Sequence, residues 1–389
     1  MRTSESTPDS AMAVALGGLA AMAAIMGVGR FVYTPILPVM VETLGLTKSQ
    51  AGIIASANYL GYLAGALAAT APLPGRKRVW FLGALFISAA TTAAMAAVDA
   101  TPAFLAIRFV GGVASAFGMI FGASLVVERL ALRARADLVW LFFAGVGLGM
   151  AVSAVIVAGL AAQGFSWRAM WTASGLVSAA AFVVAARFVP DGAGAGATPA
   201  TAAAARPRAL AVIALAYGLF GFGYVITATF IVAIVRASAE ARPFEPFVWM
   251  VVGLAAAPSV LVWNRIAGRI GPLQAFALGC VVEAAGVAAS VLWVTPPGAM
   301  LAAAALGGTF VGITAIGLMA ARALAANPHR AVAQMTVAFA LGQIVGPVVA
   351  GYAFDATGSF VSSSLAAVAA LIVAAGLAMA IRTAAPARG

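Results

Sequence analysis

The sequence is poor in charged residues, cysteine and histidine. Charged residues make up 8% of the 389 positions and hydrophobic ones 64%, whereas a soluble domain carries about 25% charged residues. This imbalance excludes a soluble fold and predicts a polytopic membrane protein. Cys280 is the single cysteine, so no disulfide can form within the chain, and His329 is the single histidine.

The chain also lacks the sequence signatures of enzymes. It has no Cys/His metal spacing, no P-loop and no Gly-x-Ser-x-Gly motif. A lone histidine outside the hydrophobic runs cannot supply a general base within a membrane. We therefore predict that the protein is not an enzyme, uses no cofactor or metal, and does not drive transport with ATP.

Hydrophobic runs fill most of the sequence, and twelve of them are long enough to cross a bilayer, which takes about 20 residues. They must form helices, because lipid offers backbone groups no other partners. The predicted spans are 11–41, 48–72, 78–98, 102–127, 138–162, 168–188, 209–236, 246–264, 272–294, 298–324, 330–354 and 359–382.

Lysine and arginine fall mostly on one side of these spans. Of the 22 basic residues, sixteen lie on the side of both termini, four on the other side, and two, Arg30 and Arg108, inside spans. This asymmetry predicts that the protein lies in the inner membrane with both of its termini in the cytoplasm. It also explains the net charge of +11 without nucleic acid. We expect a monomer whose partners are membrane lipid and a small solute.

A Gly/Ala/Pro-rich stretch divides the chain into two halves of six spans each. We predict an N-terminal bundle at 1–189, a flexible cytoplasmic linker at 190–208 and a C-terminal bundle at 209–389. The halves echo one another: Gly27-Val-Gly-Arg-Phe-Val-Tyr in span 1 aligns with Gly221-Phe-Gly-Tyr-Val-Ile-Thr in span 7, and both span 5 and span 11 carry Gly-x-x-x-Gly pairs. Internal repeats of this kind are typical of secondary transporters.

The first span contains the most unusual stretch, Gly27-Val-Gly-Arg-Phe-Val-Tyr-Thr-Pro-Ile-Leu-Pro-Val-Met40. A cation such as Arg30 is expensive inside a bilayer and normally faces a water-filled or ligand-filled interior. Pro35 and Pro38 remove backbone donors, so we expect a bend in the outer half of the span. The carbonyls freed one turn before each proline could hold Arg30 at rest.

Other polar and aromatic side chains within spans are candidates for a solute site. Guanidinium groups match carboxylates in geometry and stay charged, so Arg30 and Arg108 would favour an anion. Each could instead bond backbone carbonyls or hydroxyls, an alternative that weighs most for Arg108. The predicted substrate-binding residues are Arg30, Tyr33, Asn58, Tyr62, Arg108, Tyr224, Thr227, Trp249 and Gln343.

Glu283 is the one carboxylate well inside a span. Such a group could load and release a proton during transport, since burial opposes its ionisation. The alternative is a structural glutamate that bonds a neighbouring helix. No cluster of carboxylates and hydroxyls indicates a sodium site, so we predict proton coupling with Glu283 as its candidate carrier.

Several motifs resemble the major facilitator superfamily over essentially the whole chain. Arg108-Phe-Val-Gly-Gly112 is similar to the span-4 Arg-x-x-x-Gly motif, and Gly75-Arg-Lys-Arg78 to the end of the loop 2–3 motif, whose usual acid is missing. Two further stretches, Gly29-Arg-Phe-Val-Tyr-Thr-Pro-Ile-Leu-Pro-Val-Met40 and Ala57-Asn-Tyr-Leu-Gly-Tyr-Leu-Ala-Gly-Ala66, resemble the YbfB/YjiJ branch.

The resemblance implies an all-α membrane fold of twelve helices in two six-helix bundles. It also implies a secondary active transporter that moves a small organic solute by alternating access. From the charges inside the spans we favour an organic anion as cargo. The alternative function is a membrane sensor or scaffold that keeps the transporter fold without transporting.

Overall fold

The computed structural model describes residues 10–191 and 206–381, and helices joined by short loops make up these ranges. The first half comprises α1 (Ala11–Met22), the π-helical segment η1 (Ala23–Val28), α2 (Tyr33–Leu44), α3 (Lys48–Ala68), α4 (Lys77–Ala94), η2 (Met95–Ala97), α5 (Thr101–Leu132), η3 (Ala136–Leu138), α6 (Val139–Ala162) and α7 (Trp167–Phe188). The second half comprises α8 (Pro207–Ala237), η4 (Arg242–Phe244), α9 (Glu245–Ile270), α10 (Pro272–Leu292), α11 (Pro296–Leu324), α12 (Pro328–Thr357) and α13 (Val361–Ala380).

Twelve of the described helical stretches are long and apolar enough to cross a membrane, which confirms the predicted number of spans. Their ends differ from the prediction by a few residues: the fourth span continues to Leu132 and the eighth extends from Arg242 to Ile270. The predicted spans are shorter because they end with the hydrophobic runs, whereas these helices continue into polar turns. Most of the predicted linker, residues 192–205, lies outside the described residues.

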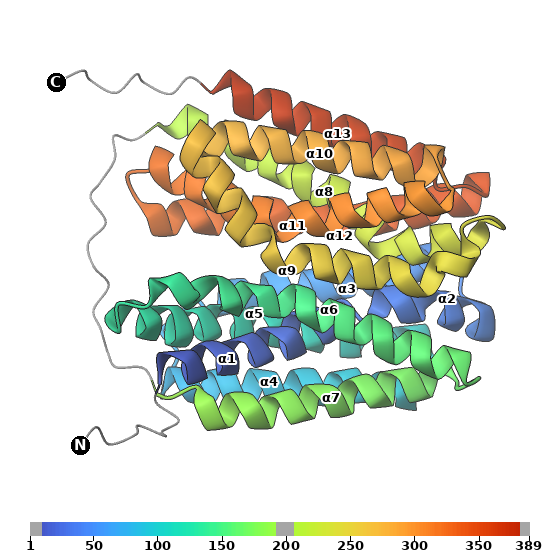
Figure 1. Ribbon diagram of the computed structural model, residues 1–389, viewed down its shortest axis with the longest axis horizontal. Coiled ribbons are helices and arrows are strands. Elements are labelled where there is room, and N and C mark those ends of the chain that lie inside the picture. Colours follow the sequence, from blue (N-terminus) through green and yellow to red (C-terminus); the bar gives the residue numbers. More distant parts are fainter. Residues whose placement is uncertain (1–9, 192–205, 382–389) are drawn as a thin grey trace.

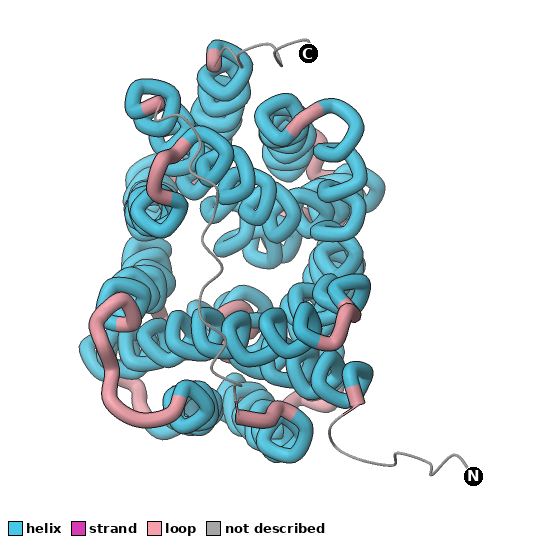
Figure 2. Tube along the Cα trace, turned by 90° about the vertical axis from the view of Figure 1, so that its left-hand side faces the viewer, coloured by secondary structure: helices cyan, strands magenta, loops and turns pink. Residues whose placement is uncertain are grey.

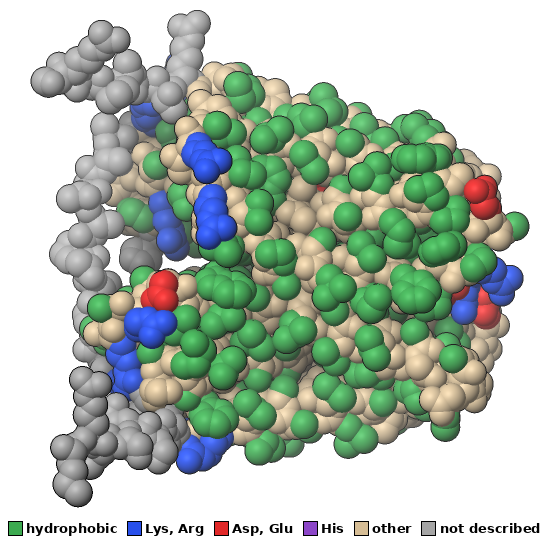
Figure 3. Space-filling model, viewed as in Figure 1, with side chains coloured by type: hydrophobic (Ala, Val, Ile, Leu, Met, Phe, Trp, Pro, Cys, Tyr) green, Lys and Arg blue, Asp and Glu red, His purple; other side chains and the backbone are tan. Residues whose placement is uncertain are grey.

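The helices form two bundles that lie side by side (Figure 1), and the view along the helices shows the same two groups (Figure 2). One bundle holds α1–α7 and the other α8–α13. Helix α3 packs against α12, α6 against α9 and α2 against α8, so three pairs of the described helices join the bundles. The flank between the two ends of the molecule is mostly hydrophobic, and Lys and Arg side chains gather toward the ends (Figure 3).

We call the end where α1 begins and α13 finishes the terminal end, and the other the far end (Figure 1). Helix caps fix the short far-end turn that links the first two spans. Gly45 adopts a left-handed φ of 65° after α2, a conformation that favours glycine. Thr47 and Gln50 then form a capping box at the start of α3.

Glycines let equivalent helices approach closely in both bundles. A Cβ at Gly145 would meet the backbone and Met22 of the first span, and one at Gly149 would meet the backbone of Ala23. In the second half, Gly342 packs in the same way on the backbone of α8, near Gly218. The Gly-x-x-x-Gly pairs of spans 5 and 11 therefore make corresponding contacts, which supports the internal repeat.

The first span is broken near its middle, before the outer half where the prolines predict a bend. The Gly29 N–H donates to the Ala24 carbonyl (2.7 Å), the wide i→i−5 pattern of a π-turn, and residues 29–32 form an irregular turn. Helix α2 then continues through Pro38. Immediately before the break, Gly27 lies directly against Gly149 of α6, where a Cβ would not fit.

Several hydrogen bonds and ion pairs join the bundles between Arg30 and the far end. The Thr34 hydroxyl donates to the Ala228 carbonyl (2.8 Å), and the Ser56 hydroxyl to that of Ile344 (2.7 Å). Nearer the far end, the Asp355 carboxylate accepts the N–H groups of Lys48 and Ser49 at 3.0 and 2.9 Å. These contacts hold the bundles together on that side.

Candidate functional site

Arg30 lies where the broken first span meets the second bundle. Its side chain is 4% exposed, and its Nη2 donates to Oε1 of Gln343 at 3.1 Å. Gln343 in turn donates through Nε2 to the hydroxyl of Tyr224 on α8. A hydrogen-bonded chain therefore runs from the first bundle through α12 to α8.

Aromatic rings surround this chain. The Arg30 guanidinium carbon lies 4.7 Å from the ring centre of Tyr59 and 4.4 Å from that of Tyr62. The Tyr224 ring stacks on Phe310 and Phe339, with centres 5.6 and 5.7 Å apart. Cation–π contacts in a desolvated place contribute about 2 kcal/mol or more. The rings thus stabilise the cation without neutralising it.

Arg108 has a different environment from Arg30. Its Nη1 donates to the Gly29 carbonyl (3.3 Å) and its Nη2 to the Arg30 carbonyl (3.1 Å). In a regular helix the Thr34 N–H would reach the Arg30 carbonyl, but here it donates to Phe31 (3.2 Å). The expectation that freed carbonyls hold Arg30 is therefore wrong: the free carbonyls lie at the break before the prolines, and they accept from Arg108.

Neither buried arginine forms an ion pair with a carboxylate of the described residues, although each is no more than 5% exposed. The Nε atoms of both also have no hydrogen-bond partner in the described part of the chain. A cation in hydrocarbon normally has a partner of opposite charge or faces a polar cavity. The interior of the bundle pair therefore carries uncompensated positive charge.

Two predicted residues bond the backbone close to Arg108. The Asn58 side chain donates to the Arg108 carbonyl (3.0 Å), which ties α3 to α5. The Tyr33 hydroxyl donates to the Ala51 carbonyl (2.9 Å), and its ring lies under the Arg108 guanidinium, 5.0 Å away. In this structure these side chains contact the broken span and Arg108 and make no hydrogen bond to the Arg30 side chain.

Trp249 and Thr227 are fully buried, and neither the indole N–H nor the hydroxyl has a hydrogen-bond partner among the described residues. The Trp249 ring approaches that of Phe31, with centres 6.5 Å apart, so it borders the Arg30 region. Of the nine predicted residues, four lie together, with Trp249 beside them: Arg30, Tyr62, Tyr224 and Gln343. Three others form an adjacent group: Arg108, Asn58 and Tyr33.

Glu283 is fully buried between α10 and α11 of the second bundle. One of its oxygens accepts a hydrogen bond from the Thr309 hydroxyl, and the other has no partner in the residues described. Phe310, which follows Thr309 in α11, packs on both Phe31 and Tyr224. Glu283 is thus separated from Arg30 by a layer of aromatic rings.

The sequence analysis missed several residues around Arg30. Tyr59 could have been found, since it lies three positions before Tyr62 and therefore on the same helix face. Phe31, Phe310 and Phe339 carried no such signal, because a phenylalanine within a hydrophobic run is most often part of the core.

Comparisons with known proteins agree with this architecture. The family described as "Uncharacterised MFS-type transporter YbfB" matches residues 22–379. No curated protein matches the chain.

Solved structures with the same fold are transporters. A mutant of the nucleoside transporter NupG has a TM-score of 0.74 at 15% identity, covering 95% of this chain and 99% of that one. The non-mutant NupG structure gives 0.71 at 15% identity, with 95% and 98% covered. A bacterial homologue of the human lysosomal transporter Spinster, in an inward-facing and unoccupied conformation, gives 0.67 at 13% identity, with 95% and 96% covered. With the family match over most of its length, this chain belongs to the YbfB family of MFS-type transporters, which are multi-pass membrane proteins.

Proposed function

We propose that this protein moves a small organic anion across the inner membrane by alternating access, driven by the proton gradient. The observation that carries the proposal is Arg30, a buried guanidinium between the bundles with a neutral partner and a free Nε. Binding sites of such transporters lie near the bilayer midplane, where the two repeats meet.

Gln343 would be the resting partner that the anion replaces. A carboxylate carries a full negative charge and can pair with a guanidinium through two parallel hydrogen bonds, whereas the amide oxygen of Gln343 accepts one, so a carboxylate could displace the amide from Arg30. Gln343 would then keep only its bond to Tyr224. Because Gln343 connects the first bundle to α8, its release would couple occupancy to movement between the bundles.

The aromatic surroundings favour a cargo with a flat or apolar part. Tyr59 and Tyr62 flank the guanidinium, and Phe31 lies within 5.7 Å of it. Such rings could contact an unsaturated carbon skeleton while Arg30 holds the carboxylate.

A nucleoside is a second candidate cargo. The same rings could stack on a base, and the Gln343 amide could pair with its edge. The solved structures of similar fold include the nucleoside transporter NupG, although identity at this level supports the fold alone.

Glu283 is the proposed proton carrier. It is buried and lacks a charged partner among the described residues. Its hydrogen-bond donor, Thr309, is followed in α11 by Phe310, whose ring packs on Phe31 next to Arg30. Its bond to Thr309 is equally consistent with a purely structural role. Transport that persists unchanged after protonophore treatment would count against proton coupling.

The experiment has two stages. A thermal-shift screen of the purified protein against organic acids, nucleosides, sugars and drugs uses the fact that a ligand of the native state stabilises it. Counterflow in proteoliposomes then tests each stabilising compound. We expect exchange of at least one organic anion. Binding without exchange for every ligand found would instead support a sensor, and exchange of nucleosides alone would replace the anion.

The proposal places both termini in the cytoplasm, because Lys and Arg predominate at that end. A reporter fused to the C-terminus tests this orientation. Green fluorescent protein should fluoresce there, whereas an active alkaline phosphatase fusion would contradict the assignment.

A further inference from the structure

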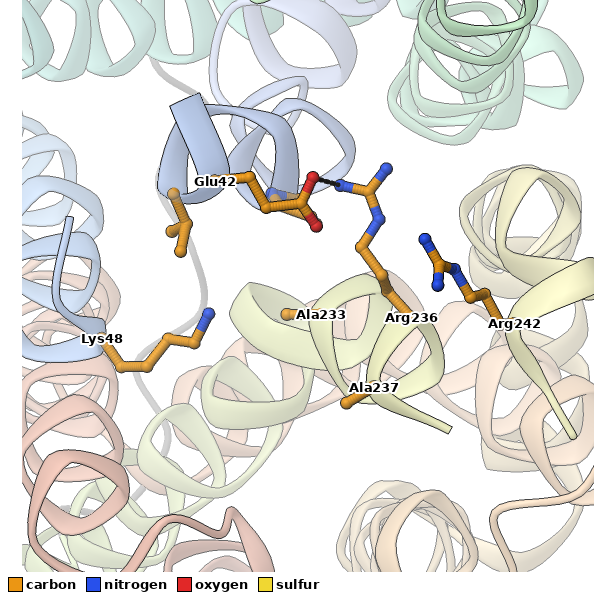
Figure 4. A pocket seen from close by; sticks show the side chains of 8 residues that line it. Glu42, Lys48, Ala233, Arg236, Ala237 and Arg242 are labelled. Atoms are coloured by element: carbon orange, nitrogen blue, oxygen red, sulfur yellow. Dashed lines mark ion pairs between the residues drawn. The ribbon is translucent and has the colours of Figure 1, made fainter. Parts of the chain in front are cut away.

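A cavity distinct from the Arg30 site lies between the bundles at the far end (Figure 4). Its volume is about 200 Å³. The lining comes from the end of α2, the start of α3, the end of α8 and η4, and consists of Pro38, Val41, Glu42, Lys48, Ala233, Arg236, Ala237 and Arg242. We call it the far-end pocket.

The lining of this pocket is rich in positive charge. Lys48, Arg236 and Arg242 face a single lining carboxylate, Glu42, whose Oε2 lies 3.3 Å from Nη1 of Arg236. A second carboxylate, Glu245, accepts from the Arg236 Nε at 3.0 Å. The described residues offer neither Lys48 nor Arg242 an ion pair, and a third carboxylate, Asp355, accepts the backbone N–H of Lys48 from outside the lining. The three cations are therefore balanced overall, but three of the four charges on the lining itself are positive.

Arg236 is not fully bonded by these two carboxylates. Its Nη1 is buried and, despite the ion pair with Glu42, makes no hydrogen bond of normal geometry among the described residues. The Glu42 side chain is 60% exposed. Ion pairs with an exposed partner contribute little to stability, so a dissolved anion can compete with Glu42 for Arg236.

We propose that the far-end pocket binds a small carboxylate and that this anion releases the contact between α2 and α8. Arg236 would supply the bidentate fork and Lys48 and Arg242 the surrounding charge. The apolar lining, Pro38, Val41, Ala233 and Ala237, suits a short carbon skeleton. The cavity is smaller than the roughly 300–1,000 Å³ of sites for drug-sized ligands, which favours a compact monoanion.

Displacing Glu42 from Arg236 would remove one of the contacts that hold the far end closed. Glu42 lies on α2, which continues from the turn that contains Arg30, and Arg236 lies on α8, which carries Tyr224. The far-end pocket and the Arg30 site therefore share the helices α2 and α8. This inference extends the proposed anion transport, but its test measures the pocket directly, so either can fail without the other.

The test uses cysteine chemistry, which is convenient because Cys280 is fully buried. In the full-length protein carrying Ala237→Cys, the labelling rate is compared for the anionic sulfonatoethyl and the cationic trimethylammonioethyl methanethiosulfonates. Ala162→Cys, at an exposed position where α6 ends, is the matched control, and unmodified protein is the blank. We expect the pocket position to prefer the anionic reagent over the control by on the order of tenfold.

A second measurement distinguishes binding of an anion in the pocket from a general positive electrostatic potential around it. Sodium propionate in place of sodium chloride, at equal ionic strength, should slow labelling of Ala237→Cys by neutral methyl methanethiosulfonate and leave Ala162→Cys unaffected. Adding Arg236→Gln should abolish this protection, whereas Glu42→Gln should strengthen it because the competing carboxylate is gone. Equal reagent preference at both positions, or propionate protection that persists in Arg236→Gln, would overturn the proposal.

Discussion

Replacing Arg108 should destabilise the protein, because this side chain holds the broken first span together. Its guanidinium donates to the carbonyls of Gly29 and Arg30, at 3.3 and 3.1 Å. Hydrogen bonds to charged groups contribute about 1.5–3 kcal/mol each, so two of them amount to roughly 3–6 kcal/mol. Removing a buried cation also removes part of the desolvation cost of burying it. The net loss in the free energy of unfolding should therefore be about 3 kcal/mol.

Arg108→Lys provides an intermediate case. The ammonium keeps the charge but has no rigid fork to reach both carbonyls, so about half of the loss should remain. The matched control is Arg265→Gln, an exposed arginine near the end of α9, which should change stability by no more than about 0.5 kcal/mol.

The assay for Arg108 is thermal unfolding of the purified protein in detergent, without added ligand. We expect the melting temperature to fall in the order wild type, Arg108→Lys, Arg108→Gln, with Arg265→Gln near the wild type. If Arg108→Gln has the same melting temperature as the Arg265→Gln control, the role assigned to Arg108 is refuted.

Three further predictions concern packing, coupling and the bond between Gln343 and Tyr224. Gly27→Ala should cost about 1–3 kcal/mol through overpacking, since its Cβ would lie 2.5 Å from the Gly149 Cα, whereas Gly83→Ala, with open space around it, should not destabilise; thermal melts compare the two. Glu283→Gln should abolish proton-driven accumulation in proteoliposomes while counterflow continues, and full accumulation in this variant would remove Glu283 from the coupling. Tyr224→Phe keeps the stacked ring but leaves the Gln343 amide without its acceptor, which should cost about 1–3 kcal/mol; an unchanged melting temperature would contradict that bond.

The architecture was predictable because the bilayer restricts the choices. Long apolar runs must be helices, and polar side chains inside them must find partners in the protein interior. That argument selected Arg30, Tyr62, Tyr224 and Gln343 separately, and the structure brings them together. Arg30 and Tyr224 occupy equivalent positions of the internal repeat, whereas the link between them through Gln343 was not predicted.

Other features depend on tertiary packing and could not be predicted. The break at residues 29–32 lies beside the contact of Gly27 with α6, which the sequence alone does not show. The bonds of Arg108 require carbonyls that become free only at that break. The pair between Glu42 and Arg236 joins residues far apart in sequence, and nothing in either local sequence indicates the other.

The affinity of a carboxylate for variants of Arg30 tests the central claim most directly. The ligand is the organic acid that stabilises the protein most in the thermal-shift screen. Its dissociation constant is determined for wild type, Arg30→Lys and Arg30→Ala. Losing a charged hydrogen-bond partner should weaken binding by about 10–150-fold in Arg30→Ala, with Arg30→Lys between it and the wild type. Three folded proteins that bind the acid equally would show that Arg30 does not contact the cargo and would contradict the account.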